Sequence, residues 1–365
     1  MIDKWRTLFR NGDYDLIVQD ATTKTIDSLS IADFNYLGLS ALASQAHDWF
    51  IDQVNTPPPA NLAPYLSLYT GSLAYQQKDY TLASELILST KEKVIQNGYI
   101  FGRDACSWLR GVNSYVHSLD NSAPFKLSEP EITTDIRDLQ ENFNCLCFLV
   151  SADSNYLSRF GQALIDSFIE HRDDDALLLI SVINPSTPAK VWISDHAVKL
   201  RKSGIYFLYT SGPENRAYYA SSRFLLTPLL LDLIDLNILA FDIDAVFTNP
   251  TSAIRESLKN FDCAFAQQEF RLPWQRCQAG RVYLSNTASG KGAAKAISDF
   301  CRLVYNDCID QWFIDQNALE YYRRINECNP SAKLGNLYKN ELVINSIFCP
   351  PGSQKKQLEG LLYQH

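Results

Sequence analysis

The sequence predicts an α/β domain that follows an all-helical N-terminal domain. From residue 144 onward, short apolar runs alternate with segments of helical periodicity, which is typical of an α/β domain with a largely parallel sheet. Residues 1–125 instead show apolar residues at helical spacing only. A chain of 365 residues is long for one hydrophobic core. We therefore expect a helical domain over 1–125, a linker over 126–143 and the α/β domain over 144–365.

The helical domain contains one stretch with the residue spacing of a tetratricopeptide unit. Small residues let two paired helices approach closely, and Asp79 with Tyr80 falls at the expected turn between them. A second hairpin is expected over 104–117. A plain helical bundle is the alternative, because repeat arrays need several units to be stable. The spacing is carried by Gly71, Ala74, Tyr75, Asp79, Tyr80 and Ala83.

The α/β domain begins with a predicted strand over 145–150 and a turn of helix-capping residues at 151–155. The next strands are expected over 177–183 and 205–209, and the helices over 156–171, 189–202 and 217–233. Ligands of such sheets bind beyond the C-terminal ends of the strands. The turn after the first strand is therefore expected to form part of a binding site.

The stretch over 237–247 is an apolar run that ends in two aspartates, Asp242 and Asp244, and then becomes apolar again. This pattern predicts a buried strand with two carboxylates at its C-terminal end. The chain turns just past a strand end, so both carboxylates are expected to reach one cation. Buried carboxylates are unstable without a counter-charge, which a divalent metal supplies. We expect this pair and the turn at 151–155 to share one site.

Composition and charge exclude several classes of function. A net charge of −8 argues against a nucleic-acid-binding protein. The most apolar stretch, 224–241, is interrupted by Asp232 and Asp235, so no membrane span is expected. The N-terminal residues show no apolar signal core, and the nine cysteines form no Cys-x-x-Cys pair. Reduced thiols and a cytoplasmic location are therefore expected.

Residues 144–350 resemble a GT-A-type glycosyltransferase, a domain with the nucleotide-diphospho-sugar transferase fold. The resemblance implies a Rossmann-like mixed sheet flanked by helices. Asp242-Ile243-Asp244 is similar to the DxD motif of the family. The other matching segments, in chain order, are FLVSADSNY at 148–156, RFLLTPLL at 223–230, QAGRVYL at 278–284 and WFIDQN at 312–317.

The resemblance implies a role for each matching residue. Asp242 and Asp244 would bind Mn²⁺ or Mg²⁺, which neutralises the departing diphosphate, and Asp242 would also contact the ribose. Asp315 and Gln316 would be the catalytic residues beside the reacting carbon. The remaining donor-binding residues, for the base, ribose, diphosphate and sugar of a nucleotide sugar, would be Ser151, Ala152, Asp153, Tyr156, Arg223, Gln278 and Gly280.

The donor is expected to be a UDP-sugar and the acceptor a glycan or a protein docked by the helical domain. Two features depart from the family pattern. Gln278 stands where the family usually has Asn, and the late histidine that binds metal in many members is lacking, since the only late histidine is the terminal His365. The segment over 352–356, which includes Lys355, is expected either to close over the diphosphate or to be a solvated tail.

Two other interpretations remain open at this stage. A haloacid-dehalogenase-type phosphatase would use Asp242 as nucleophile and Asp244 as acid/base, with Ser285 in its second motif and Asp307 and Asp310 holding Mg²⁺. That fold normally starts with the Asp-x-Asp strand, which would leave 144–209 unexplained. A non-catalytic docking protein with a degenerate transferase domain is the third possibility. Its paired buried carboxylates would then lack a counter-charge.

Overall fold

The computed structural model describes residues 2–25, 28–46, 52, 59–97, 123–133, 146–173, 176–268, 271–305, 313–349, 355, 359 and 362–363. The chain forms two compact units. The first comprises Met1–Asn121 with Gln268–Cys277, and the second comprises Ser122–Gln267 with Gln278–His365. The second hairpin predicted over 104–117 lies outside the described residues.

The first unit is helical, as the apolar spacing predicts. Ser30 begins one of its helices with a capping box, in which its hydroxyl group accepts a hydrogen bond from the backbone N–H of Asp33 and its own backbone N–H donates to the Asp33 carboxylate. The helices are α1 (Ile2–Asn11), α2 (Tyr14–Ala21), α3 (Ile31–Ser44), α5 (Ala63–Gln76), α6 (Tyr80–Asn97) and α13 (Pro273–Arg276).

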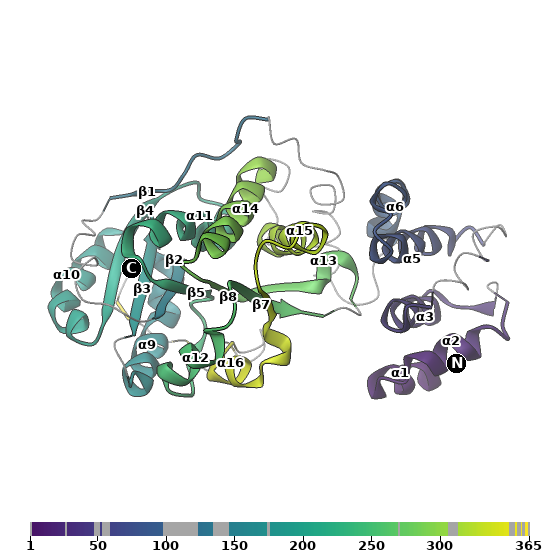
Figure 1. Ribbon diagram of the computed structural model, residues 1–365, viewed down its shortest axis with the longest axis horizontal. Helices are drawn as coiled ribbons and strands as arrows, with labels where there is room; N and C mark the ends of the chain where they lie inside the picture. Colours follow the sequence, from purple (N-terminus) through teal and green to yellow (C-terminus); the bar gives the residue numbers. More distant parts are fainter. Residues whose placement is uncertain are drawn as a thin grey trace. The chain divides into compact units, whose positions relative to one another are not determined.

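The hairpin of α5 and α6 forms where the tetratricopeptide-like spacing places it (Figure 1). Asp79 begins α6, because its side chain accepts a hydrogen bond from the backbone N–H of Leu82. Gly71 lets the two helices approach: a Cβ atom there would lie 2.8 Å from the Cγ1 atom of Ile87. Membership of a tetratricopeptide repeat stays a prediction.

The division into units differs from the predicted boundaries in two places. Gln268–Cys277 belongs to the first unit, although the prediction assigned it to the α/β domain. In this segment the Arg276 guanidinium lies 5.9 Å from the ring centre of Tyr75, a long-range contact that no local pattern reveals. The predicted linker contributes β1 (Glu131–Ile132), which pairs antiparallel with β4 at the sheet edge. A strand of two residues is too short to show the alternation of apolar and polar side chains from which strands are predicted.

The second unit is built on an eight-stranded mixed sheet in the order β1-β4-β3-β2-β5-β8-β7-β9. A separate antiparallel pair joins β10 to β6. The strands are β2 (Leu146–Asp153), β3 (Leu177–Ile183), β4 (Ile205–Ser211), β5 (Asn237–Phe241), β6 (Val246–Phe247), β7 (Cys263–Gln267), β8 (Cys277–Leu284), β9 (Leu334–Asn336) and β10 (Ile347–Phe348). The helices are α9 (Ser154–His171), α10 (Thr187–Lys202), α11 (Arg216–Ile234), α12 (Thr251–Leu258), α14 (Ala288–Val304), α15 (Ile314–Cys328), α16 (Glu341–Ser346) and the 3₁₀ helix η4 (Leu337–Lys339).

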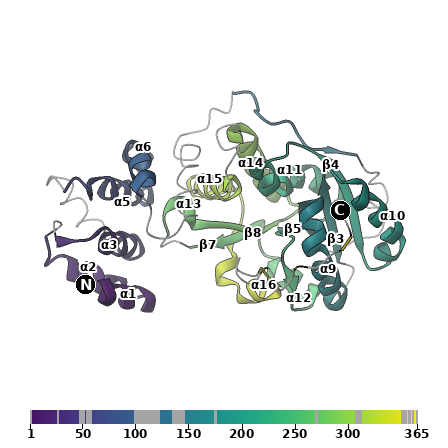
Figure 2. The ribbon, with the colours of Figure 1, turned by 180° about the vertical axis from the view of Figure 1, so that it is seen from behind.

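Helices cover both faces of this sheet. Figures 1 and 2 show α11, α14 and α15 on one face and α9, α12 and α16 on the opposite face. Phe148, Phe168 and Phe247 pack edge to face in the core between β2 and α9. The predicted architecture, a Rossmann-like mixed sheet flanked by helices after an N-terminal helical region, is confirmed.

The sheet brings the ends of its central strands to one edge. Strands β4, β3, β2 and β5 run parallel, so their C-terminal ends lie together. Val150 on β2 pairs with Phe241 on β5. Ser151, the next residue of β2, and Asp242, the first residue after β5, therefore lie at this edge side by side. Strand β8 runs antiparallel to β5, with Arg281 opposite Phe241, which brings Gly280 to the same edge.

Cysteines in the described part of the chain are free thiols, and most of them are buried. This agrees with the expectation of reduced cysteines, while the cytoplasmic location stays a prediction. Within the same described part, no helix has both the length and the apolar composition that crossing a membrane requires.

Candidate functional site

A cavity of about 180 Å³ opens at the edge where these strands end. Its lining includes ten of the eleven residues predicted to form the site, and they come from distant parts of the second unit. They are Ser151, Ala152, Asp153, Tyr156, Arg223, Asp242, Asp244, Gly280, Asp315 and Gln316. The eleventh, Gln278, does not line the cavity; its side chain is exposed near the start of β8.

The position of Gln278 follows from the register of β8. Gly280 lies beside Asp242, and a Cβ atom on Gly280 would stand 3.4 Å from Oδ2 of Asp242. Gln278 lies two residues before Gly280, which places it about 7 Å closer to the N-terminal end of β8. The expected sugar contact through Gln278 stays a prediction, while the absent side chain of Gly280 leaves space beside the Asp242 carboxylate.

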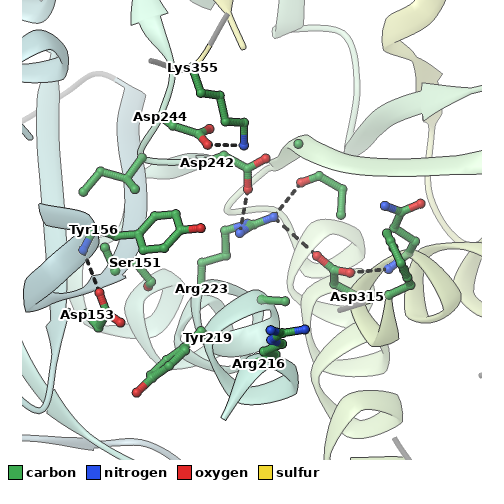
Figure 3. Close-up of a pocket in the computed structure, with 17 residues that line it drawn as sticks. Ser151, Asp153, Tyr156, Arg216, Tyr219, Arg223, Asp242, Asp244, Asp315 and Lys355 are labelled. Atoms are coloured by element: carbon green, nitrogen blue, oxygen red, sulfur yellow. Dashed lines mark hydrogen bonds and ion pairs between the residues drawn. The ribbon is translucent and has the colours of Figure 1, made fainter. Parts of the chain in front are cut away.

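The guanidinium group of Arg223 lies at the centre of the site (Figure 3). It projects from α11 and is 5% exposed. Its Nη1 atom is 3.0 Å from Oδ1 of Asp242, and its Nη2 atom is 3.4 Å from Oδ2 of Asp315. Nη2 also donates a hydrogen bond of 2.9 Å to the carbonyl oxygen of Ala279. Arg223 thus fixes the ends of β5 and β8 and the start of α15 around the cavity.

One guanidinium charge is shared by two carboxyl groups of unequal burial. The Asp242 side chain is 42% exposed, whereas that of Asp315 is 6% exposed. Burial raises the pKa of Asp315 to about 7, and the charge of Asp242 adds to this, although Arg223 opposes it. Asp315 therefore holds a proton up to neutral pH.

Asp244 is paired with a lysine from the C-terminal part of the chain. It is 4% exposed, and its Oδ2 atom accepts a hydrogen bond from the ammonium group of Lys355 (Figure 3). Burial and the neighbouring charge of Asp242 raise the pKa of Asp244, and the Lys355 ammonium opposes this rise. The buried Asp244 carboxylate is therefore already paired with the Lys355 ammonium group.

The sequence pattern predicted a turn over 151–155, but β2 continues to Asp153 and α9 starts at Ser154. The last residues of β2 therefore carry the polar groups expected in that turn. The Asp153 carboxylate accepts a hydrogen bond of 2.7 Å from the backbone N–H of Tyr156, which caps α9. One of its oxygens is thereby occupied. Ser151, two residues earlier, is 8% exposed, and its Oγ atom has no hydrogen-bond partner among the described residues.

Unpaired polar atoms gather around this cavity. Within the described chain, Ser151 Oγ, Arg223 Nε and Gln316 Oε1 are buried atoms without a hydrogen-bond partner, and all three residues line it. A buried polar group left unpaired costs about 1–3 kcal/mol. Such groups are retained where a ligand completes them. A ligand rich in hydrogen-bond donors and acceptors fits this cavity.

Sequence reasoning missed Arg216 and Tyr219, which also line the cavity. Arg216 and Tyr219 lie three residues apart, and they precede Arg223 by seven and four residues on one face of α11. This spacing from Arg223 is the signal that would have identified them. Burial raises the pKa of Tyr219, and the charges of Asp153 and Glu214 add to the rise.

The carboxylates fit a divalent cation that takes its other ligands from a substrate. Within the described residues, no group of three or more His, Cys, Asp and Glu side chains could hold a metal alone. Mg²⁺ commonly binds through one or two carboxylates plus substrate phosphates. The ammonium on Asp244 marks a place where a positive charge is stable. His365 lies outside the described residues.

Among the described residues, the second motif of a phosphatase does not reach this site. Leu284 pairs with Ile238 at the opposite end of β5 from Asp242. Ser285, the residue of its second motif, is thus remote from the aspartate pair. It instead contacts Thr287 and Asp262. Asp307 and Asp310 lie outside the described residues.

No protein-family model matches the sequence, and no curated protein matches it. Among solved structures, the chain is similar to the bifunctional glycosyltransferase WbbM, with 12% identity and a TM-score of 0.35 over 53% of this chain and 39% of that chain. It is also similar to the glycosyltransferase GlyE of Streptococcus pneumoniae TIGR4. The apo form has 14% identity and a TM-score of 0.38, and a second structure has 13% and 0.39.

Both GlyE comparisons cover 57% of this chain and 55% of that chain. The chain therefore spans 39–55% of the length of these neighbours. Similarity at this level of identity concerns the fold and not the activity.

The protonation of Asp315 predicts a pH-dependent difference between the wild type and Asp315→Asn. Between pH 4 and 7 the folded wild type holds a proton that the unfolded chain releases near 3.8, so its free energy of unfolding falls as pH rises to about 7. Asn has no proton to lose. The stability of Asp315→Asn relative to wild type should therefore rise by a few kcal/mol over this range in urea unfolding. Asp195→Asn, at an exposed position of α10, is the control. A pH-independent difference would contradict the assignment.

Proposed function

We propose that this protein is a GT-A-type glycosyltransferase. It moves a sugar from a nucleotide-diphosphate sugar, a UDP-sugar by resemblance, to a glycan or protein acceptor with the help of Mn²⁺ or Mg²⁺. The convergence of Asp242, Asp244 and Arg223 with three unpaired polar atoms in one cavity carries this proposal. The cavity also lies at the C-terminal strand ends, where α/β folds bind nucleotides.

The donor would lie along the strand ends. Ser151, near the end of β2, and the ring of Tyr156 would contact the base and ribose, and Ser151 Oγ would gain the hydrogen bond that it lacks. Asp242 and Asp244 would hold the metal, which neutralises the negative charge of the leaving diphosphate when it is bound. Arg223 adds a fixed cation whose Nε–H is still unpaired.

The sugar would lie between Gly280 and the start of α15. Gly280 leaves space for the ring beside Asp242. Gln316 Oε1 can accept a hydrogen bond from a sugar hydroxyl group, and its backbone N–H is fixed by the Asp315 carboxyl group at 2.8 Å. In the transfer, the bond from the anomeric carbon to the diphosphate breaks and a bond to an acceptor oxygen forms. The proton of the acceptor hydroxyl group passes to an oxygen of the departing diphosphate.

The helical first unit would bind the acceptor. None of its described residues lines the cavity, and paired helices commonly form partner-binding surfaces. A degenerate transferase that only docks partners would share this unit. The two proposals differ in whether the cavity binds and turns over a nucleotide sugar.

Nucleotide binding tests the donor assignment. We expect calorimetry with UDP, GDP and CMP to show one nucleotide that binds in the presence of Mn²⁺, with at least tenfold weaker binding in Asp244→Asn. A tenfold change corresponds to about 1.4 kcal/mol. Asp195→Asn should bind as the wild type does. Absence of nucleotide binding, together with Mg²⁺-dependent hydrolysis of an aryl phosphate, would favour the phosphatase. Absence of both would favour a docking protein.

Hydrolysis of the donor tests the role of Gln316. The bound nucleotide from the calorimetry identifies the sugar-nucleotide series to assay with water as acceptor. Gln316→Leu keeps the side-chain size but removes the amide, so turnover should fall on the order of 100-fold, whereas the Kd of the nucleotide should change little. An unchanged turnover number would remove Gln316 from the reacting centre.

A further inference from the structure

Lys355 occupies the position that a metal would take on Asp244. Its ammonium group contacts Oδ2, the buried oxygen of a carboxyl group that is 6% exposed, while the lysine side chain itself is 35% exposed. The two residues are 111 positions apart in the sequence. Figure 3 shows Lys355 reaching Asp244 from the side opposite to Arg223.

Arg223, the other cation that forms ion pairs with these carboxyl groups, has different partners. Arg223 contacts Asp242, Asp315 and the carbonyl oxygen of Ala279. Lys355 is therefore the cation that forms an ion pair with Asp244 within the described residues. A divalent metal on the same oxygen would stand next to the ammonium, and two cations in contact in a poorly solvated site repel strongly. Lys355 and a metal cannot share Asp244.

The C-terminal part of the chain is anchored independently of Lys355. The backbone N–H of Leu362 donates to the carbonyl oxygen of Ser158 at 3.0 Å, and the Ser158 hydroxyl donates to the carbonyl oxygen of Tyr363 at 3.1 Å. Tyr363 also donates its hydroxyl proton to the carbonyl oxygen of Ser154. These bonds hold the segment on α9. Lys355 can therefore leave Asp244 without detachment of the chain end.

We propose that Lys355 and the divalent metal are alternative occupants of Asp244, so that metal binding displaces the lysine ammonium into the cavity. This rests on the function proposed above. A displaced ammonium needs an anion, and a nucleotide diphosphate supplies one. Metal and nucleotide therefore bind with positive coupling: Mn²⁺ alone must break an ion pair, whereas Mn²⁺ with the nucleotide exchanges one anion for another. In the absence of the donor, the ion pair between Lys355 and Asp244 therefore weakens metal binding.

Titration of Mn²⁺ without nucleotide tests this competition, with free Mn²⁺ followed by electron paramagnetic resonance. Lys355→Met keeps the length of the side chain and removes its charge. We expect it to bind Mn²⁺ at least about tenfold more tightly than the wild type. Lys355→Arg, which keeps the charge, should bind as weakly as the wild type. Lys339→Met, which removes an exposed charge from η4, should match the wild type.

The outcomes separate this inference from the proposed function. Equal or weaker Mn²⁺ binding by Lys355→Met overturns the competition, and the metal role of Asp244 still stands if UDP with Mn²⁺ binds the wild type. If no variant binds Mn²⁺ even with nucleotide, both proposals fall. A second readout on the wild type is the Kd of Mn²⁺ at saturating UDP, which should be at least about tenfold lower than without UDP. In Lys355→Met this coupling should shrink.

Discussion

The buried guanidinium group of Arg223 is the contact on which the site depends. It joins α11 to the carboxylate that follows β5, to the carboxyl group that begins α15 and to the backbone of β8. Three elements from distant parts of the sequence thus meet at one side chain. Breaking a buried ion pair by removing one partner typically destabilises a protein by about 3–5 kcal/mol. The contacts of Arg223 therefore contribute both to the shape of the cavity and to the stability of the second unit.

Charge balance connects this contact to function. Three carboxyl groups, those of Asp242, Asp244 and Asp315, form ion pairs with two cations, Arg223 and Lys355. This network has one carboxyl group more than it has cations, and burial raises the pKa of Asp315 to about 7, so that Asp315 holds a proton. A divalent metal and a diphosphate would add nearly equal and opposite charges. These carboxyl groups and cations can accommodate both if the Lys355 ammonium moves from Asp244 to the diphosphate. A protein that only docks partners has no need of such a balanced and unpaired polar cavity.

The sequence predicts those parts of the structure that follow from local patterns. The strand over Leu177–Ile183 has the predicted bounds because every residue in it is buried, which produces a continuous apolar run. The aspartates after β5 were predicted because they interrupt such a run. Local patterns could not reveal that Lys355 meets Asp244 or that Gln268–Cys277 joins the first unit, since long-range packing decides both. The position of Gln278 outside the cavity lining is likewise a matter of register, because two residues along β8 separate it from Gly280 at the cavity edge.

Anomalous diffraction from crystals grown with Mn²⁺ and UDP would test the central claim most directly. The account predicts one manganese peak within about 2.5 Å of an Asp244 carboxylate oxygen, with the Lys355 ammonium moved away from that oxygen and toward the diphosphate. Crystals grown without UDP at the same Mn²⁺ concentration should keep the ion pair between Lys355 and Asp244. A manganese ion bound elsewhere, with Lys355 still on Asp244 in the presence of UDP, would contradict the account.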